Sequence, residues 1–305
     1  MLRKIFTFAL FAAAVGIVVF WIVTIPQTIT ASALEPYTPD AANGRTMFYA
    51  GGYPSCHAVP RQDDRTRLGG GRALKSPFGT FYAPNISPDP SDGIGAWSEA
   101  EFVTAMVKGV SPDGRHYYPA FPYVSYQRMT YPDLRDLFAY LKTLPPVQGK
   151  ARDHDLPFPL NIRRSVGGWK FLFVDGKPFH PDPTRSAQWN RGAYLVNGPG
   201  HCAECHSPRN TLGAVIHEHR FSGAPLLEEQ GWVPNITGKR LGEWSEKDLS
   251  YFLRSGMTPD GDATGSLMTF VIRNTSELSD SDLAAMAEFL KSLHAIDGLP
   301  GAGKK

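Results

Sequence analysis

Residues 202–206 read Cys202-Ala203-Glu204-Cys205-His206. Two thiols at this spacing, followed directly by His, fit the attachment pattern of a c-type haem. Each thiol can add across one vinyl group of the macrocycle, and the adjacent His206 reaches the iron from the same side. The motif therefore predicts a haem that is bound covalently through Cys202 and Cys205, with His206 as an axial ligand.

Two other uses of a Cys-x-x-Cys pair fit the chain less well. A zinc site needs further ligand pairs, and the one other cysteine of the chain, Cys56, is remote in sequence. A thioredoxin-like dithiol needs a βαβ setting, which the sequence does not show. Three cysteines are also too few for a fold held together by disulfides. The haem interpretation is therefore preferred.

A second Cys-His pair lies upstream, in Tyr53-Pro54-Ser55-Cys56-His57, where Tyr53 takes the place of the first thiol. We expect this site to hold haem through a single thioether from Cys56, with His57 as axial ligand. The reason is that haem supplies much of the core of such a small domain, and an empty pocket would leave a costly apolar cavity. Two alternatives stay open. The first copy has lost covalent haem and serves as a docking or packing module, or Tyr53 is an engineered or erroneous residue.

The two Cys-His pairs belong to an internal repeat. Each copy contains, in order, a helix-like segment, the Cys-His pair, Pro-Asn-Ile, Trp-Ser-Glu, (Ser/Thr)-Pro-Asp-Gly and a closing segment with apolar residues at helical spacing. These features begin at Ala42, Cys56, Pro84, Trp97, Ser111 and Asp133 in the first copy, and at Ala187, Cys205, Pro234, Trp244, Thr258 and Asp282 in the second. Ser98 and Ser245 are expected to cap helices that end at Gly109 and Gly256. Two copies are too few for a solenoid, so we interpret them as a duplicated domain.

These patterns predict an all-α fold with two tandem cytochrome c-like domains behind an N-terminal transmembrane helix. No alternating strand pattern stands out. The expected division of the chain is a membrane anchor or signal segment (1–34), a first domain with the degenerate site (35–146), a linker rich in Pro and aromatic residues (147–185) and a second domain (186–298).

The sequence also offers candidates for the rest of each haem site. Electron-transfer haems usually take Met as the second axial ligand, because its thioether favours reduced iron. The repeat register or the position relative to the attachment site argues against Met47, Met106, Met257 and Met286. This leaves Met129 and Met268, although a gap-free alignment sets Phe121 opposite Met268, so spacing favours Met268 over Met129. Asn85 and Asn235 recur in both copies, and either contact with haem propionates or capping and packing would explain them.

The N-terminal segment is apolar. Arg3 and Lys4 precede residues 5–24, which carry no charge. As a helix these residues would reach roughly 30 Å, the thickness of a bilayer core. The two bases favour a cytoplasmic start and an exported remainder. A cleaved signal peptide is the alternative, with Ala31-Ser32-Ala33 as the cleavage site, but the apolar run is longer than usual for one.

The charge balance bounds the class of partner. The chain has 305 residues, with 31 Lys and Arg against 29 Asp and Glu. This balance lacks the basic excess of a nucleic-acid-binding protein, so no nucleic-acid partner is expected. The length suffices for two ordinary domains.

Several of these segments resemble the cytochrome c subunit of membrane-bound alcohol and gluconate dehydrogenases. The resemblance is carried by residues 198–210 around the attachment motif, by Tyr118–Met129, by Gly265–Met268 and by Asn274–Thr275, and it covers nearly all of residues 40–295. Members of that family are membrane-attached relays between a periplasmic dehydrogenase and the respiratory chain. The resemblance also implies Met129 and Met268 as the sixth ligands of the two haems.

The chain departs from this family in two ways. The dehydrogenase subunits carry three haem domains, whereas this chain has room for two and is more similar to shorter dihaem relatives, whose partner enzymes vary. Tyr53 also departs from the family pattern and bears on covalent attachment of the first haem.

We therefore expect a dihaem electron-transfer protein rather than an enzyme. It would be held in the inner membrane by a single-pass anchor, with both haem c groups in the periplasm. A periplasmic dehydrogenase would supply the electrons, and a terminal oxidase, a quinone or another cytochrome would accept them. One rival hypothesis is a haem enzyme of the peroxidase or thiosulfate-oxidising type, which needs an open iron site. The other is a one-haem cytochrome whose first domain is an interaction module.

Overall fold

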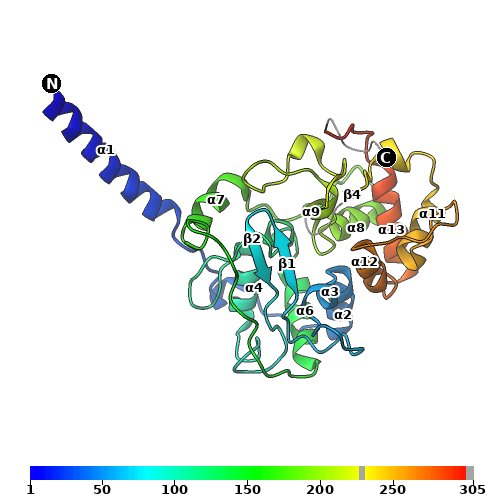
Figure 1. Ribbon diagram of the computed structural model, residues 1–305. Helices are drawn as coiled ribbons and strands as arrows, with labels where there is room; N and C mark the ends of the chain where they lie inside the picture. Colours follow the sequence, from blue (N-terminus) through cyan, green and yellow to red (C-terminus); the bar gives the residue numbers. More distant parts are fainter. Residues whose placement is uncertain (227–230, 300–305) are drawn as a thin grey trace.

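The computed structural model describes residues 1–226 and 231–299, and most of its regular structure is helical (Figure 1). The helices are α1 (Leu2–Val23), α2 (Ala41–Ala50), α3 (Tyr53–His57), α4 (Glu99–Lys108), α5 (Tyr123–Tyr126), α6 (Tyr131–Thr143), α7 (Ser165–Phe173), α8 (Ala187–Asn197), α9 (Ala203–His206), α10 (Gly238–Leu241), α11 (Glu246–Ser255), α12 (Met268–Thr275) and α13 (Asp280–Lys291). Single 3₁₀ turns occupy Ala31–Ala33 and His217–His219.

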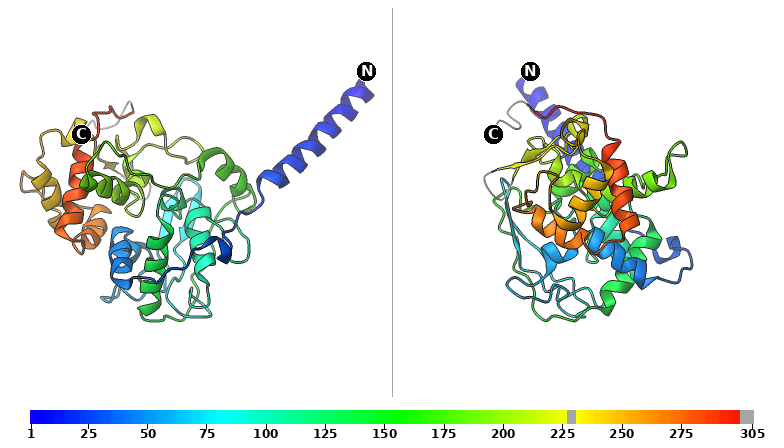
Figure 2. Two further views of the ribbon diagram at one scale, coloured as in Figure 1. Left: turned by 180° about the vertical axis from the view of Figure 1, so that it is seen from behind. Right: turned by 90° about the vertical axis from the view of Figure 1, so that its right-hand side faces the viewer.

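Helix α1 projects from the rest of the molecule as a straight, isolated helix (Figures 1 and 2). Its 22 residues have a mean hydropathy of 2.6 over the most apolar window, and none of that window is buried. At 1.5 Å per residue such a helix reaches roughly 33 Å, enough to cross a bilayer core. Within the described residues, α1 is the one helix that is long and apolar enough for this.

Most of the remaining helices follow the internal repeat; α7 lies between the two copies. We refer to residues 35–146 as the first half and to residues 186–298 as the second half. In each half the opening helix packs against the closing helix, α2 on α6 and α8 on α13. In each pair, the two helices approach closely at a glycine of the opening helix. A Cβ on Gly44 would overlap the carbonyl oxygen of Asp136, and one on Gly192 would overlap that of Ala285. Glycine at these points allows the two backbones to meet.

The capping residues expected from the sequence are confirmed. Ser98 caps α4 and Ser245 caps α11, each within a capping box that satisfies the exposed N–H groups of the first turn. Both helices end at a glycine in the left-handed region, with φ of 57° at Gly109 and 76° at Gly256. The local signals for helix start and stop therefore act alike in both halves.

The expectation of an all-α fold holds only as a mostly helical one. Strand β1 (Ala73–Ser76) pairs antiparallel with β2 (Gly79–Tyr82), and β3 (Ala224–Pro225) pairs antiparallel with β4 (Trp232–Val233). Strands of two to four residues are too short to produce an alternating pattern that differs from chance. The linker also contains a helix, α7, that the sequence patterns did not predict.

The two halves contact each other through equivalent positions, which we call the crossed contacts. Ser125 Oγ, on α5, donates a hydrogen bond to Glu204 Oε1 (2.9 Å). Asn274 Nδ2, on α12, donates to Ser55 Oγ (2.6 Å). Ser55 and Glu204 precede the second thiol of their motifs, and Ser125 and Asn274 lie equally far before the closing helices. Each half therefore places the helix before its closing helix against the attachment motif of the other half.

Candidate haem sites

The attachment motif of the second half forms the short helix α9. Cys202 is the N-cap of α9, and Cys205 and His206 follow three and four residues later. Residues at these spacings lie on the same face of a helix. Cys202 is half-buried and Cys205 is exposed. The turn therefore presents both thiols and the imidazole to one side, as covalent haem attachment requires.

A hydrogen bond orients the imidazole of His206. The distance between His206 Nδ1 and the carbonyl oxygen of Pro234 is 2.8 Å. Because a carbonyl can only accept, Nδ1 carries the proton and the lone pair of Nε2 stays available to a metal. Burial lowers the pKa of His206, and this hydrogen bond only partly opposes that shift. The neutral imidazole that iron ligation needs is thus the favoured form.

The thiols of the second half are not joined in a disulfide. Burial raises the pKa of the Cys202 thiol to about 12, so the thiol is protonated at neutral pH. None of the three cysteines, all of which lie within the described residues, forms a disulfide. In the same part of the chain, no group of three or more His, Cys, Asp or Glu side chains could hold a metal ion. The donor set at α9 fits a macrocycle that brings its own ligands to iron, rather than a bare zinc ion.

The first half keeps the histidine arrangement of the second. His57 ends α3, and its Nδ1 lies 2.9 Å from the carbonyl oxygen of Pro84. Burial lowers the pKa of His57, and the hydrogen bond to Pro84 works against that shift. The same tautomer is therefore set in both halves, with Nε2 left available. Cys56 precedes His57 on the same turn, as Cys205 precedes His206.

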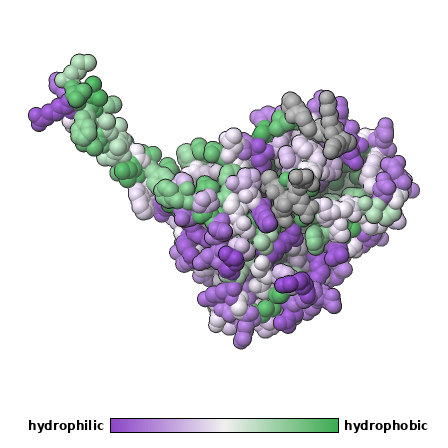
Figure 3. Space-filling view, in the orientation of Figure 1, coloured by the Kyte–Doolittle hydropathy of each residue, from purple (hydrophilic) through white to green (hydrophobic). Residues whose placement is uncertain are grey.

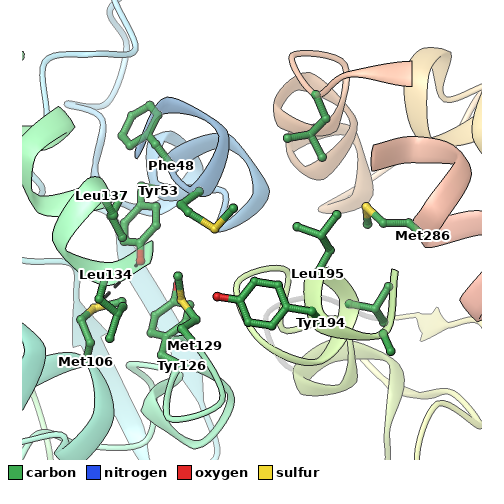
Figure 4. Packing of buried hydrophobic residues seen from close by; sticks show 14 of the residues in the cluster. Phe48, Tyr53, Met106, Tyr126, Met129, Leu134, Leu137, Tyr194, Leu195 and Met286 are labelled. Carbon is green, nitrogen blue, oxygen red and sulfur yellow. Dashed lines mark hydrogen bonds between the residues drawn. The ribbon is translucent and has the colours of Figure 1, made fainter. Parts of the chain in front are cut away.

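Tyr53 is the main difference between the two sites. Its ring is 5% exposed and stacks with Phe48 and Tyr126, each with ring centroids 5.9 Å apart. It also lies over His57, at a centroid distance of 6.4 Å, and its hydroxyl is 3.9 Å from Met106 Sδ. Figure 4 shows Tyr53 pointing into the core between α2 and the Tyr126 ring. The ring therefore fills space beside the candidate ligand that a thiol would leave open.

The two candidate methionines take different positions. Met268 is half-buried and begins α12, which packs on α11. Met129 is 1% exposed and directly precedes Thr130, the N-cap of α6. In the second half the residue before the N-cap of α13 is Leu278, so Met129 is the structural counterpart of Leu278 and not of Met268.

The contacts of Met129 also point toward the other half. Its Cγ lies 3.6 Å from where a Cβ on Gly198 would be. Its neighbour Thr130 donates its backbone N–H to the hydroxyl of Tyr194, in the second half (3.2 Å). In Figure 4 Met129 lies beside Tyr126, on the side that faces Tyr194. Met129 is thus part of the packing between the two halves.

Two residues that hold the histidines in place were visible in the sequence only as a recurrence. Asn85 Nδ2 donates to the carbonyl oxygens of Val147 (2.7 Å) and Gly149 (2.9 Å), and Asn235 Nδ2 donates to that of Ile296 (2.8 Å). Each Asn directly follows the proline that accepts from the histidine. The two asparagines therefore tie the proline loop to the segment beyond the closing helix. Of the roles considered for the two asparagines, these hydrogen bonds correspond to packing, because each side chain holds two backbone segments together.

The two sites fit haem unequally. The second half supplies two thiols and an oriented neutral histidine on α9, and Met268 begins α12, which packs on α11, α2 and α3. The first half supplies one thiol and an oriented histidine, but Tyr53 fills the place of the other thiol and Met129 is displaced from the position of Met268. The residues of α9 fit the covalent attachment of haem, and those of the first half fit it in part.

Comparison with known proteins agrees with this geometry. The cytochrome c family model matches residues 190–294. The chain is 46% identical over 262 residues to a protein of Cereibacter sphaeroides named dihaem cytochrome c-type, and the match covers 85% of this chain and 88% of that protein. It is 37% identical over 265 residues to the fructose dehydrogenase cytochrome subunit of Gluconobacter japonicus, covering 85% of this chain and 54% of that protein.

A third relative shows how far the similarity extends into larger proteins. The chain is 42% identical over 253 residues to one of the subunits of nicotinate dehydrogenase from Pseudomonas putida, covering 82% of this chain but 21% of that protein. The chain thus spans about half of the fructose dehydrogenase relative and a fifth of the nicotinate dehydrogenase relative.

These relatives confirm the resemblance inferred from the sequence. Several are named as cytochrome c subunits of alcohol, fructose or gluconate dehydrogenases, which confirms the expectation of an electron-transfer protein rather than a catalytic subunit. The high coverage of the Cereibacter protein extends the likeness over both halves of this chain. The chain belongs to the family of c-type cytochromes that includes this dihaem cytochrome and the cytochrome c subunits of alcohol, fructose and gluconate dehydrogenases.

Proposed function

We propose that this protein is a membrane-anchored dihaem cytochrome that relays electrons from a periplasmic dehydrogenase to the respiratory chain. The observation that carries the proposal is the second site, where α9 presents Cys202, Cys205 and a neutral, oriented His206 together. The dehydrogenase subunits among its relatives support a dehydrogenase as the electron donor. A terminal oxidase, a quinone or another cytochrome would accept the electrons.

Each residue of the second site has a distinct role in this proposal. A haem c group supplies reversible one-electron chemistry at its iron. Cys202 and Cys205 would tether the macrocycle, and His206 would bind the metal through Nε2. The carbonyl oxygen of Pro234 accepts from Nδ1, which fixes the ring orientation and makes Nε2 a stronger donor. Met268 is the proposed sixth ligand, and a thioether there would raise the reduction potential.

We propose the same fold for both halves, with cytochrome c domains at 35–146 and 186–298 and a linker at 147–185. The repeated order of helices and the matched His–Pro hydrogen bonds support this division. So do two lysines that donate to a glycine carbonyl oxygen shortly before α4 and α11: Lys142 to Gly95, and Lys291 to Gly242.

The first site is proposed to hold its haem through a single thioether from Cys56, with His57 as axial ligand. The oriented imidazole of His57 supports this, because the hydrogen bond from Nδ1 to Pro84 leaves Nε2 available to a metal. Met129 is the weaker of the two proposed sixth ligands, since it occupies the position of Leu278 and packs toward Gly198.

Residues 1–34 are proposed to be a retained inner-membrane anchor, with the haem domains in the periplasm. The structure of the segment after α1 supports retention over cleavage at Ala31–Ala33. Thr24 is fully buried, and its carbonyl oxygen lies 2.9 Å from Nε2 of His116. The N–H of Ile29 donates to Thr104 Oγ1 (2.9 Å). Cleavage after Ala33 would remove these contacts from the folded part of the protein.

The haem content of the purified full-length protein tests the proposal. The protein would be produced with haem-maturation factors, and its pyridine haemochrome spectrum and haem-to-protein ratio would be measured. Two haems per chain, with the α-band shifted to the red by one unsaturated vinyl group, are expected. One haem per chain with an ordinary c-type band would contradict the dihaem relay.

A second measurement separates the relay from a haem enzyme. Peroxidases and related enzymes need an open or exchangeable iron site. A Met–iron charge-transfer band, with no change in the spectrum on adding cyanide or peroxide, is expected for a relay. Rapid ligand binding at the second haem would instead favour an enzyme.

A further inference from the structure

Large apolar side chains lie exposed around the point where α1 leaves the body of the molecule. We call them the basal patch: Ile25, Phe171, Leu172 and Leu212, which are 50%, 68%, 65% and 55% exposed. Trp169 Nε1 donates to the carbonyl oxygen of Leu212 (2.9 Å), which joins the loop of the second half to α7. Figure 3 shows apolar surface continuing from α1 onto the body at its base.

Helix α7 turns an apolar face outward. Val166 and Gly167 are buried against the body. Phe171 and Leu172 lie in the last turn of the helix, and both side chains are mostly exposed. A surface helix of a water-exposed domain normally has a polar outer face. An exposed apolar face of this kind marks an interaction site.

The position of α7 relative to α1 is fixed by a group of polar contacts. Arg164 Nε donates to Thr24 Oγ1 and Arg164 Nη2 donates to the carbonyl oxygen of Trp21, both at 2.8 Å. The guanidinium also lies 4.4 Å from the centroid of the Trp21 ring. Gly167 allows a close approach, since a Cβ there would come within 2.7 Å of Thr24 Cβ. Figures 1 and 2 both show α7 beside the inner end of α1.

We infer that the basal patch lies in the interfacial layer of the same bilayer that α1 crosses. The inference rests on the proposed anchor. Helix α1 ends at Val23, so Thr24 and the start of α7, which is bonded to it through Arg164, stand at the level where the helix leaves the hydrocarbon. Burying Phe and Leu side chains there removes apolar area from water. A Trp ring paired with an Arg at this level is typical of membrane interfaces.

The bilayer is preferred over a protein partner because the apolar surface continues from α1 onto the basal patch. A helix fixed to the exit point of a membrane anchor has lipid headgroups as its nearest neighbours. The contact would give the molecule a second attachment to the membrane besides α1. With two attachments, both halves would have a defined orientation over the bilayer.

The test uses a fluorescent probe in the full-length holoprotein. Leu172→Cys is labelled with a small polarity-sensitive dye and reconstituted into nanodiscs of phosphatidylcholine and phosphatidylglycerol, with or without nitroxide-bearing lipid. Tyr251→Cys, which is 60% exposed on α11 at the far end of the molecule from α1, is the matched control. The parent chain, taken through the same labelling, corrects for dye on Cys56. The ratio of emission in the two lipids removes the constant quenching by haem.

We expect blue-shifted emission and strong nitroxide quenching at position 172, and neither effect at position 251. Adding Phe171→Glu to the Leu172→Cys chain should reduce the quenching severalfold, while the haem spectrum reports that the fold is intact. Equal, weak quenching at both positions would overturn the inference and leave the patch for a protein partner. Alkaline carbonate extraction of the full-length chain, reconstituted into liposomes of the same lipids, tests the anchor separately. Release by carbonate would contradict the proposed anchor, whereas retention without quenching at 172 contradicts the basal contact alone.

Discussion

The attachment sites of the two halves share the arrangement of the histidine and differ at the position of the first thiol. Both place a histidine at the end of a short helix and fix its ring through a proline carbonyl, at 2.9 Å for His57 and 2.8 Å for His206. The place of Cys202 is taken by Tyr53, whose ring packs with Phe48 and Tyr126. The scaffold that orients an axial ligand is therefore independent of the residues that tether the macrocycle, and one can change while the other stays.

The largest expected effect comes from removing the thiols of the second half. The double variant Cys202→Ser, Cys205→Ser should lose one covalent haem per chain, because no other thiol lies on α9. Haem staining after denaturing electrophoresis measures the covalent haem. The mirror variant Cys56→Ser should lose the other covalent haem. If Cys56→Ser leaves the haem content unchanged, the first half does not attach haem and the two sites differ in kind.

The next effect follows from giving the first half the missing thiol. Tyr53→Cys should allow a second thioether, so the pyridine haemochrome α-band should move to the blue, toward that of ordinary haem c. The converse variant Cys202→Tyr should move the band of the second site to the red. An unchanged spectrum together with unchanged haem content in Tyr53→Cys would show that the added thiol forms no thioether, so the missing thiol is not what limits attachment in the first half.

A smaller effect compares the two methionines. Met268→Leu should abolish the Met–iron charge-transfer band of the second haem and lower its reduction potential, because the thioether favours reduced iron. Met129→Leu should have the weaker effect, since Leu already occupies the equivalent position at Leu278. Near-infrared absorption and potentiometric titration measure both. A larger loss in Met129→Leu than in Met268→Leu would reverse the ranking of the two ligands.

The smallest effect concerns the crossed contacts. Asn274→Ala removes buried hydrogen bonds to Ser55 and to the carbonyl oxygen of Phe270, and should lower the free energy of unfolding by about 1 to 3 kcal/mol. Ser125→Ala should cost about 0.5 to 1.5 kcal/mol, because Glu204 keeps its ion pair with Arg209 at 2.7 Å. Urea unfolding of the holoprotein measures both. Equal costs would mean that Arg209 does not compensate for the lost hydroxyl.

The sequence predicted the features that depend on local pattern. The serine caps, the glycine stops and the closing helices recur at fixed offsets, and the structure contains them. The sequence pattern did not predict features that depend on contacts between distant parts of the chain. The stacking of Tyr53 on Tyr126 joins residues far apart in sequence, and α7 has its apolar face outward, which removes the usual amphipathic signal. Met129 was a candidate ligand because of its residue type. Its equivalence to Leu278 became visible only from the N-cap residue that follows each of them.

The crossed contacts have the form of an interface between two copies of one protein. In a dimer with two-fold symmetry, a surface on one protomer meets a second surface on its partner, and the reverse contact occurs as well. Here the segment containing Ser125 meets the motif of the other half, and the segment containing Asn274 makes the reciprocal contact. Residues 147–185 thus join covalently what resembles a homodimer. Either half produced alone would keep both complementary surfaces exposed, and we would expect it to self-associate.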